Sequence, residues 1–151
     1  MLKRASGPVT VTKAVSFDAK PPVAASERAE IEPMGRKVAA IEIGKPMFSD
    51  RDHKWAERRV PEFVRGWNHV LASMKGGQAT CTKAGTVYML THAREPNTWG
   101  DSLEDDLKAK GFSRVTTIKY GDGPGNVYAI LSKRIQAGEK LSWGRFAVLI
   151  F

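Results

Sequence analysis

Short runs of apolar residues, bounded by glycine, proline and charged residues, recur along most of this chain. Runs of this length that are rich in β-branched and aromatic residues are typical of β-strands. We therefore predict six strands, at residues 36–45, 78–83, 86–92, 113–120, 127–134 and 141–151. Residues 83–85 are expected to turn a hairpin between the second and third strands. The glycine-rich stretch 121–126 is expected to do the same between the fourth and fifth.

Between the first and the second predicted strand, the apolar residues follow a helical spacing. Ser49 is a suitable N-cap, and Asp50 and Asp52 follow it where a helix dipole favours negative charge. Pro61 is best placed as the first residue of a second helical segment, which the glycines at 76–77 end. That segment carries apolar side chains on one helical face, at Phe63, Trp67, Val70, Leu71 and Met74. A shorter helix is predicted at residues 101–111.

These elements predict an α/β or α+β fold with a single mixed β-sheet of about six strands and two main helices. The first 35 residues differ in composition, with many Ala, Pro, Val, Ser and Lys residues and Phe17 as the only aromatic residue. Adjacent prolines at 21–22 exclude a helix or an interior strand there. We predict an extended arm at residues 1–35, disordered alone, and a domain at residues 36–151. The run VTVT at 9–12 could add as a strand to another sheet edge.

The size and charge of the chain limit the classes of protein to consider. The chain has 151 residues, 42% of them hydrophobic, which suits one domain with a proper core. Its net charge of +8 favours a polyanionic or acidic partner, such as nucleic acid, an anionic membrane surface or an acidic protein. No stretch has the ~18 apolar residues of a membrane span, and the N-terminus does not resemble a secretory signal. These features predict an intracellular, cytoplasmic protein or a component of a virion or nucleoprotein particle.

The single cysteine, Cys81, excludes an intrachain disulfide. It lies in a predicted strand, so we expect a buried, unreactive thiol. A nucleophilic role would require an activating base, and no such base is evident in the sequence.

The stretch SDRDHKWAERR at residues 49–59 concentrates charged and metal-capable side chains. On a helix its basic residues would share a stripe that can follow phosphates, with a tryptophan beside it for stacking. The predicted contacts to nucleic acid or an acidic partner are Arg51, Lys54, Trp55, Arg58, Arg59 and Arg65. The alternative is a solvated helix face, because acidic residues are interleaved. Asp50, His53 and Glu57 would share another stripe, but a metal site normally takes further ligands from another element, so we predict no metal and no cofactor.

A second candidate site is the loop between a predicted strand and the short helix. Loops at the carboxyl ends of strands often carry function in α/β sheets. The residues that could line a pocket there are His92, Arg94, Asn97, Trp99 and Asp101, with Glu95 beside them. The alternative is a connecting loop that uses Pro96 to end the strand and Asp101 to cap the helix.

The runs VLASMKGGQATC, TVYMLTH, LEDDLKAKGFSRVTTI and NVYAILSKR resemble the last third of a class I methyltransferase. The resemblance implies a similar order of helices and strands over about 70 of 151 residues. The glycine-rich cofactor loop of that family has no match here, so no cofactor-binding residue carries over.

The main functional prediction is a non-enzymatic basic protein in a larger assembly, such as a virion or nucleoprotein particle. It would contact nucleic acid or neighbouring subunits, and the arm would dock on a neighbour. One alternative is a small or degenerate enzyme-like domain that uses His92 as an acid–base group. Another is an inhibitor or adaptor that binds a single protein.

Overall fold

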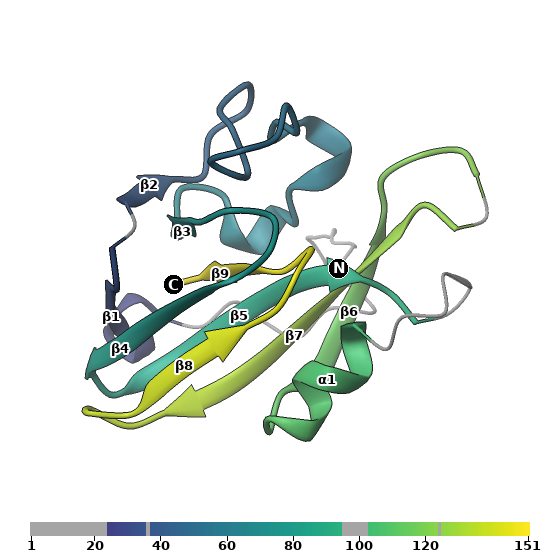
Figure 1. Ribbon diagram of the computed structural model, residues 1–151. Coiled ribbons are helices and arrows are strands. Elements are labelled where there is room, and N and C mark those ends of the chain that lie inside the picture. The colour runs from purple at the N-terminus through teal and green to yellow at the C-terminus, as the bar shows by residue number, and fades with distance from the viewer. Residues whose placement is uncertain (1–23, 36, 95–102, 124) are drawn as a thin grey trace, which may run out of the picture.

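The computed structural model describes residues 24–35, 37–94, 103–123 and 125–151. Within these ranges the chain forms two antiparallel β-sheets and one short helix, α1 (Leu103–Ala109). Figure 1 shows α1 beside β6 and β7, and the segment between β2 and β3 on the opposite side of the molecule.

The smaller sheet has three strands in the order β1 (Glu30–Pro33), β4 (Gly77–Lys83), β8 (Lys140–Trp143). The larger sheet has six strands in the order β2 (Lys37–Ala40), β3 (Asn68–Leu71), β9 (Val148–Ile150), β5 (Gly85–His92), β7 (Val127–Ile135), β6 (Ser113–Lys119). Three short 3₁₀ turns accompany them, η2 (Ala25–Glu27), η3 (Glu57–Arg59) and η4 (Glu62–Val64).

The prediction of a single mixed sheet with two main helices is therefore wrong, because the protein is mostly β with two sheets. The predicted long helix is replaced by turns, η3, η4 and the strand β3. Gly66 interrupts that segment with φ +83, a left-handed conformation that ends helical geometry. Asp50 does not sit at a helix start; its carboxylate accepts a hydrogen bond from the Met74 amide at 2.8 Å.

Two predicted connections also differ in the structure. Residues 83–85 do not turn a hairpin, because β4 and β5 lie in different sheets and the chain crosses between them. Gly85 sits at this crossing, where an added Cβ would lie 2.4 Å from the backbone nitrogen of Ala29. The last predicted strand is two strands, β8 and β9, in different sheets. The hairpin across 121–126 is confirmed, since Lys119 of β6 faces Val127 of β7.

Both faces of the six-stranded sheet are buried at its central strands, which explains the nearly continuous apolar sequence of β5. One face packs against the three-stranded sheet through residues such as Val87, Met89, Cys81 and Trp143. The Cys81 thiol is buried, as expected, and burial raises its pKa. The opposite face of the six-stranded sheet, including Tyr88, Leu90, Ile130, Val148 and Ile150, is covered by Ile41, Met47, Trp55, Val60, Val64 and Trp67.

Part of the predicted arm lies in the described structure. Residues 30–33 form β1, which pairs with β4, and Ala29 and Ile31 are buried. Residues 1–23, including the run at 9–12, lie outside the described residues.

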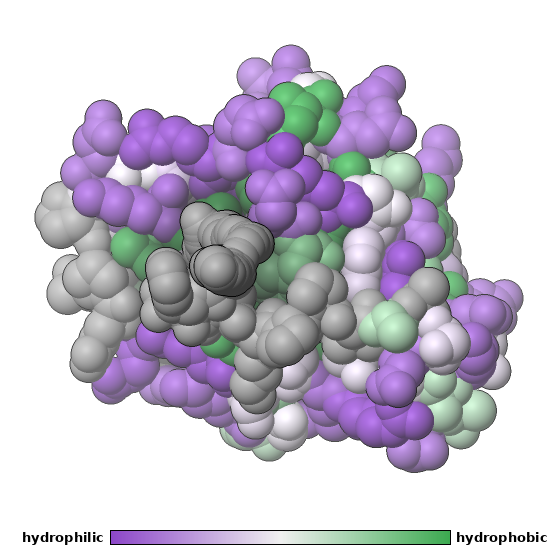
Figure 2. All heavy atoms as spheres, turned by 180° about the vertical axis from the view of Figure 1, so that it is seen from behind, coloured by the Kyte–Doolittle hydropathy of each residue, from purple (hydrophilic) through white to green (hydrophobic). Residues whose placement is uncertain are grey.

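The described surface has few large apolar side chains. Met34, Val38 and Ile43 are the exposed ones, and on the face in Figure 2 hydrophobic areas lie among hydrophilic residues. Over the described residues no helix has the length and apolar character needed to cross a membrane.

Candidate functional site

The basic residues of the 49–65 stretch are mostly exposed and paired with nearby acidic groups. Arg51 lies 3.6 Å from Asp50, and Lys54 lies 3.9 Å from Asp52. The longer-range pairs are Arg58 with Asp122 and Arg65 with Glu57, each at 2.9 Å. The positive charge of this stretch is therefore largely balanced by its own neighbours.

Trp55 belongs to the core and not to a binding surface. Its side chain is 1% exposed, and its indole N–H donates to His69 Nε2 at 3.3 Å. Its ring is therefore unavailable for stacking on a base.

The structure does not bring the three metal-capable residues of this stretch together. Asp50 binds the Met74 amide, Glu57 binds Arg65, and His53 packs edge-on against Phe48. Within the part of the chain that the structure describes, no three His, Cys, Asp or Glu residues are grouped to hold a metal ion.

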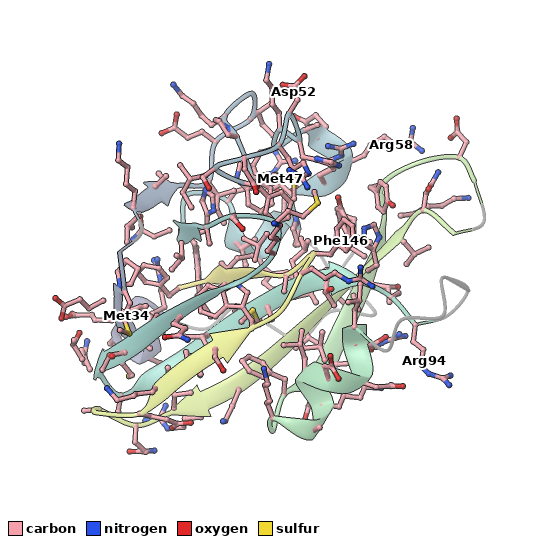
Figure 3. The ribbon with its side chains drawn as sticks, viewed as in Figure 1. Met34, Met47, Asp52, Arg58, Arg94 and Phe146 are labelled. Atoms are coloured by element: carbon pink, nitrogen blue, oxygen red, sulfur yellow. The ribbon has the colours of Figure 1, made fainter. Side chains whose placement is uncertain are left out.

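Residues from five separate segments meet around a small pocket of about 110 Å³. The 46–59 segment supplies an arginine and a histidine, β5 ends at a second histidine, and the β6–β7 hairpin supplies two tyrosines. Figure 3 shows Met47 and Phe146 near one another at this pocket. Its lining residues are Met47, Phe48, His53, Arg59, Met74, Leu90, His92, Tyr120, Tyr128 and Phe146.

His92, the last residue of β5, lies in an aromatic environment. Its Nδ1 is 3.3 Å from the Tyr120 hydroxyl, and the rings of Tyr128 and Phe146 lie 5.3 Å from its centre. Burial, with a smaller contribution from the nearby His53 and Arg59, lowers the pKa of His92 to about 4. The imidazole is therefore neutral at pH 7 and can donate one hydrogen bond and accept another.

Over the part of the chain that the structure describes, the residues lining the pocket include an arginine but no carboxylate. Arg59 is partly buried; it donates to the Lys54 carbonyl at 3.3 Å, and its guanidinium lies 5.8 Å from the centre of the Tyr120 ring. Tyr120 in turn stacks on Tyr128 at 4.1 Å. The Nδ1 atom of His53 is buried and has no hydrogen-bond partner among the described residues.

Phe146 holds an unusual backbone conformation at the pocket wall. Its φ of 58° is in the left-handed region, which is uncommon for a bulky residue. Two hydrogen bonds hold it there: its amide donates to the Met74 carbonyl, and its carbonyl accepts from the Thr91 hydroxyl, both at 2.9 Å. Strained residues of this kind cluster at functional sites.

The predicted 92–102 site is brought together only in part. His92 lines the pocket, but Arg94 lies by α1, where its Nε donates to Asp105 at 2.9 Å (Figure 3). Asn97, Trp99 and Asp101 lie outside the described residues. The other pocket residues come from distant segments that no local motif connects, so no sequence pattern groups them with His92.

No family model matches the chain, and no curated protein matches it by sequence. Among solved structures, it is similar to a GH138 enzyme targeting pectin rhamnogalacturonan II, with a TM-score of 0.55 and 14% identity. The match covers 93% of this chain and 17% of that one. At this identity the likeness concerns the fold alone, and the chain spans about a sixth of the length of that enzyme.

Proposed function

We propose that this chain is a non-catalytic binding module of two-sheet β fold, and that the pocket around His92 and Arg59 binds an anionic group of its ligand. The observation that carries the proposal is the composition of the pocket. It combines a guanidinium, two imidazoles and two phenol hydroxyls inside aromatic walls, with no acidic residue among the described lining. Apolar walls with a few converging polar groups are typical of ligand sites.

Binding is favoured over catalysis because the pocket lacks the groups that hydrolytic or acyl-transfer chemistry needs. The described lining residues include no carboxylate, serine or cysteine, and the Tyr120 hydroxyl beside His92 stays protonated because burial raises its pKa. The low pKa of His92 also makes it a weak base at neutral pH.

The architecture agrees with a role as one module among others. The solved enzyme with a similar fold is far longer than this chain, so the same fold exists there as a minor part of a larger protein. That agreement concerns architecture and carries no information on the ligand.

The test is to titrate the protein with a panel of small anions while recording imidazole NMR signals. We expect His53 and His92 to shift on binding and the buried His69 to stay unchanged. Arg59→Gln removes the cation that faces Tyr120 and should abolish the shifts. Arg58→Gln is the matched control, because that neighbour points outward to Asp122 and should bind normally. If no anion in the panel shifts His53 or His92, the proposal is wrong.

The role in a nucleic-acid-containing assembly stays a prediction. Local pairing of Arg51, Lys54, Arg58 and Arg65 with acidic residues gives it little support. Co-elution of the full chain with a short nucleic acid at ~50 mM salt would support it, since phosphate contacts are strongest at low salt.

A further inference from the structure

We propose that the ligand group is a carboxylate carried on a six-membered ring, a cyclic monocarboxylate, with the carboxylate at Arg59 and the ring against the aromatic walls. This inference rests on the proposed function and names the chemical class of its ligand.

The size of the pocket limits what can enter it. Its volume of about 110 Å³ is below the ~300–1,000 Å³ of a typical site for a whole small molecule. It exceeds what one water needs, roughly 10–15 Å³. The pocket therefore takes one functional group and part of the ring that bears it, and the rest of the ligand stays outside.

The charge of the pocket selects a monoanion. Among the described lining residues, Arg59 is the one that is permanently charged, because an arginine keeps its proton at every ordinary pH. The low pKa of His92 leaves its imidazole neutral at pH 7. One permanent positive charge matches a carboxylate, which stays monoanionic from pH 7 to pH 5, better than phosphate, which is partly a dianion at pH 7.

The geometry of the donors also favours a carboxylate over a phosphate. A guanidinium presents planar, parallel N–H groups that match the two oxygens of a carboxylate. The Tyr120 hydroxyl and the imidazoles supply additional side-chain donors. Phosphate sites commonly use backbone N–H groups at a helix N-terminus or a glycine-rich nest, and α1 contributes no residue to this lining.

The walls of the pocket suit a ring. Phe48, Tyr120, Tyr128 and Phe146 line it together with the flexible side chains of Met47 and Met74. Aromatic and thioether groups pack well against a ring face, and a methyl group such as that of acetate would leave most of this surface unused. The same walls accept an aromatic ring or the apolar face of a sugar ring, so uronates and aromatic carboxylates share the chemistry.

Binding of a carboxylate should also be coupled to proton uptake. The charged and titratable groups facing His92 are His53 and Arg59 from the 46–59 segment, Tyr120 from the end of β6 and Tyr128 from β7. A negative charge among them raises the pKa of His92, because it stabilises the imidazolium. Affinity should therefore rise as the pH falls from 7 to 5.

The experiment is isothermal titration calorimetry of the full chain with glucuronate, benzoate, acetate and inorganic phosphate, at pH 7 and pH 5. We expect glucuronate or benzoate to bind at least tenfold more tightly than acetate and phosphate, and more tightly at pH 5. Tyr120→Phe should weaken the cyclic ligand several-fold, and Arg58→Gln should not. Preference for glucuronate identifies a saccharide source, and preference for benzoate identifies an aromatic acid.

Two results would overturn the inference. Phosphate binding as tightly as the cyclic carboxylates would show that the site selects charge and not the carboxylate. Acetate binding as tightly as both would show that the ring contributes nothing. In either case the proposed anion-binding function would stand. If none of the four probes binds, both the cyclic-carboxylate inference and the anion-binding function are wrong.

Discussion

His69 makes the stability of this protein sensitive to mild acid. Its side chain on β3 is fully buried, and its Nε2 accepts a hydrogen bond from the Trp55 indole at 3.3 Å. Its Nδ1 is buried without a partner among the described residues. Burial lowers the pKa of His69 from 6.5 to about 4, because an imidazolium there would lose its hydration.

The sign of the effect follows from proton binding. Between the folded pKa of about 4 and the unfolded value of 6.5, the unfolded chain binds the proton and the folded chain does not. The stability contributed by neutral His69 is therefore complete above pH 6.5 and is lost as the pH falls toward 4. At ~1.36 kcal/mol for each pKa unit, the full loss is about 3 kcal/mol, of which about 2 kcal/mol is gone at pH 5.

The assay is urea unfolding at pH 7.5 and pH 5.0, for the wild type and for His69→Gln. Glutamine does not titrate, and its carbonyl oxygen can accept the Trp55 N–H in place of Nε2. His92 and the carboxylates affect both proteins equally, so they cancel in the comparison. We expect the wild type to lose about 2 kcal/mol more than the variant between the two pH values.

Equal losses in the two proteins would refute this reasoning, because they would mean that His69 titrates alike in the folded and unfolded chains. A proton count gives an independent check. The pH dependence of the unfolding free energy near pH 5.5 should be steeper in the wild type by close to one proton per molecule.

Three further substitutions test other parts of the structure by the same unfolding assay. Glu104→Gln should cost about 1–3 kcal/mol, because its fully buried carboxylate accepts from the Arg94 amide at 2.9 Å and the Arg114 Nε at 2.6 Å, and a neutral amide replaces these charge-assisted hydrogen bonds only in part. Gly85→Ala should cost at least ~1–3 kcal/mol through overpacking against backbone, whereas Gly144→Ala, with nothing within 4 Å of the new Cβ, should be nearly neutral. Arg58→Ala should change stability by less than ~1 kcal/mol, because its ion pair is exposed to solvent.

Strand positions could be predicted because local patterns determine them, but strand partners could not. The predicted strands at 78–83 and 86–92 match β4 and β5 closely. Their separation into two sheets depends on long-range pairing, since β5 pairs with β7 and β9. The close packing of Gly85 against Arg28 and Ala29 marks the crossing, and that contact appears only once the fold is known.

The predicted long helix shows how one periodicity can fit two structures. Of the predicted helical face, Trp67, Val70 and Met74 are buried, and Phe63 and Leu71 are partly buried. They do not share one face, because Val70 lies in β3 and packs in the core between the two sheets, whereas Trp67 and Met74 pack on the opposite face of the six-stranded sheet. Apolar spacing reports which residues face the core and does not by itself distinguish a helix from an irregular covering segment. Gly66, inside the proposed helix, was the sequence signal against it.

The wrong helix prediction also left the pocket unrecognised. On a helix, Arg58 and Arg59 would both belong to one basic surface. In the structure the first is exposed and pairs with Asp122, while the second is partly buried and faces Tyr120. Of the pocket residues, His92 could be proposed from its place at a strand end, but its partners depend on the tertiary fold.

Several features of the pocket oppose stability, and their coincidence argues for binding. Phe146 holds a left-handed backbone, which costs on the order of 1–3 kcal/mol. The buried His53 Nδ1 has no partner among the described residues, and an unmet polar atom of this kind costs a further ~1–3 kcal/mol. The cavity itself forgoes packing contacts that a larger side chain at its wall would make. A ligand that fills the cavity and bonds to the His53 imidazole would offset both the unmet polar atom and the missing packing contacts. Free energy gained on binding the folded state alone adds directly to stability.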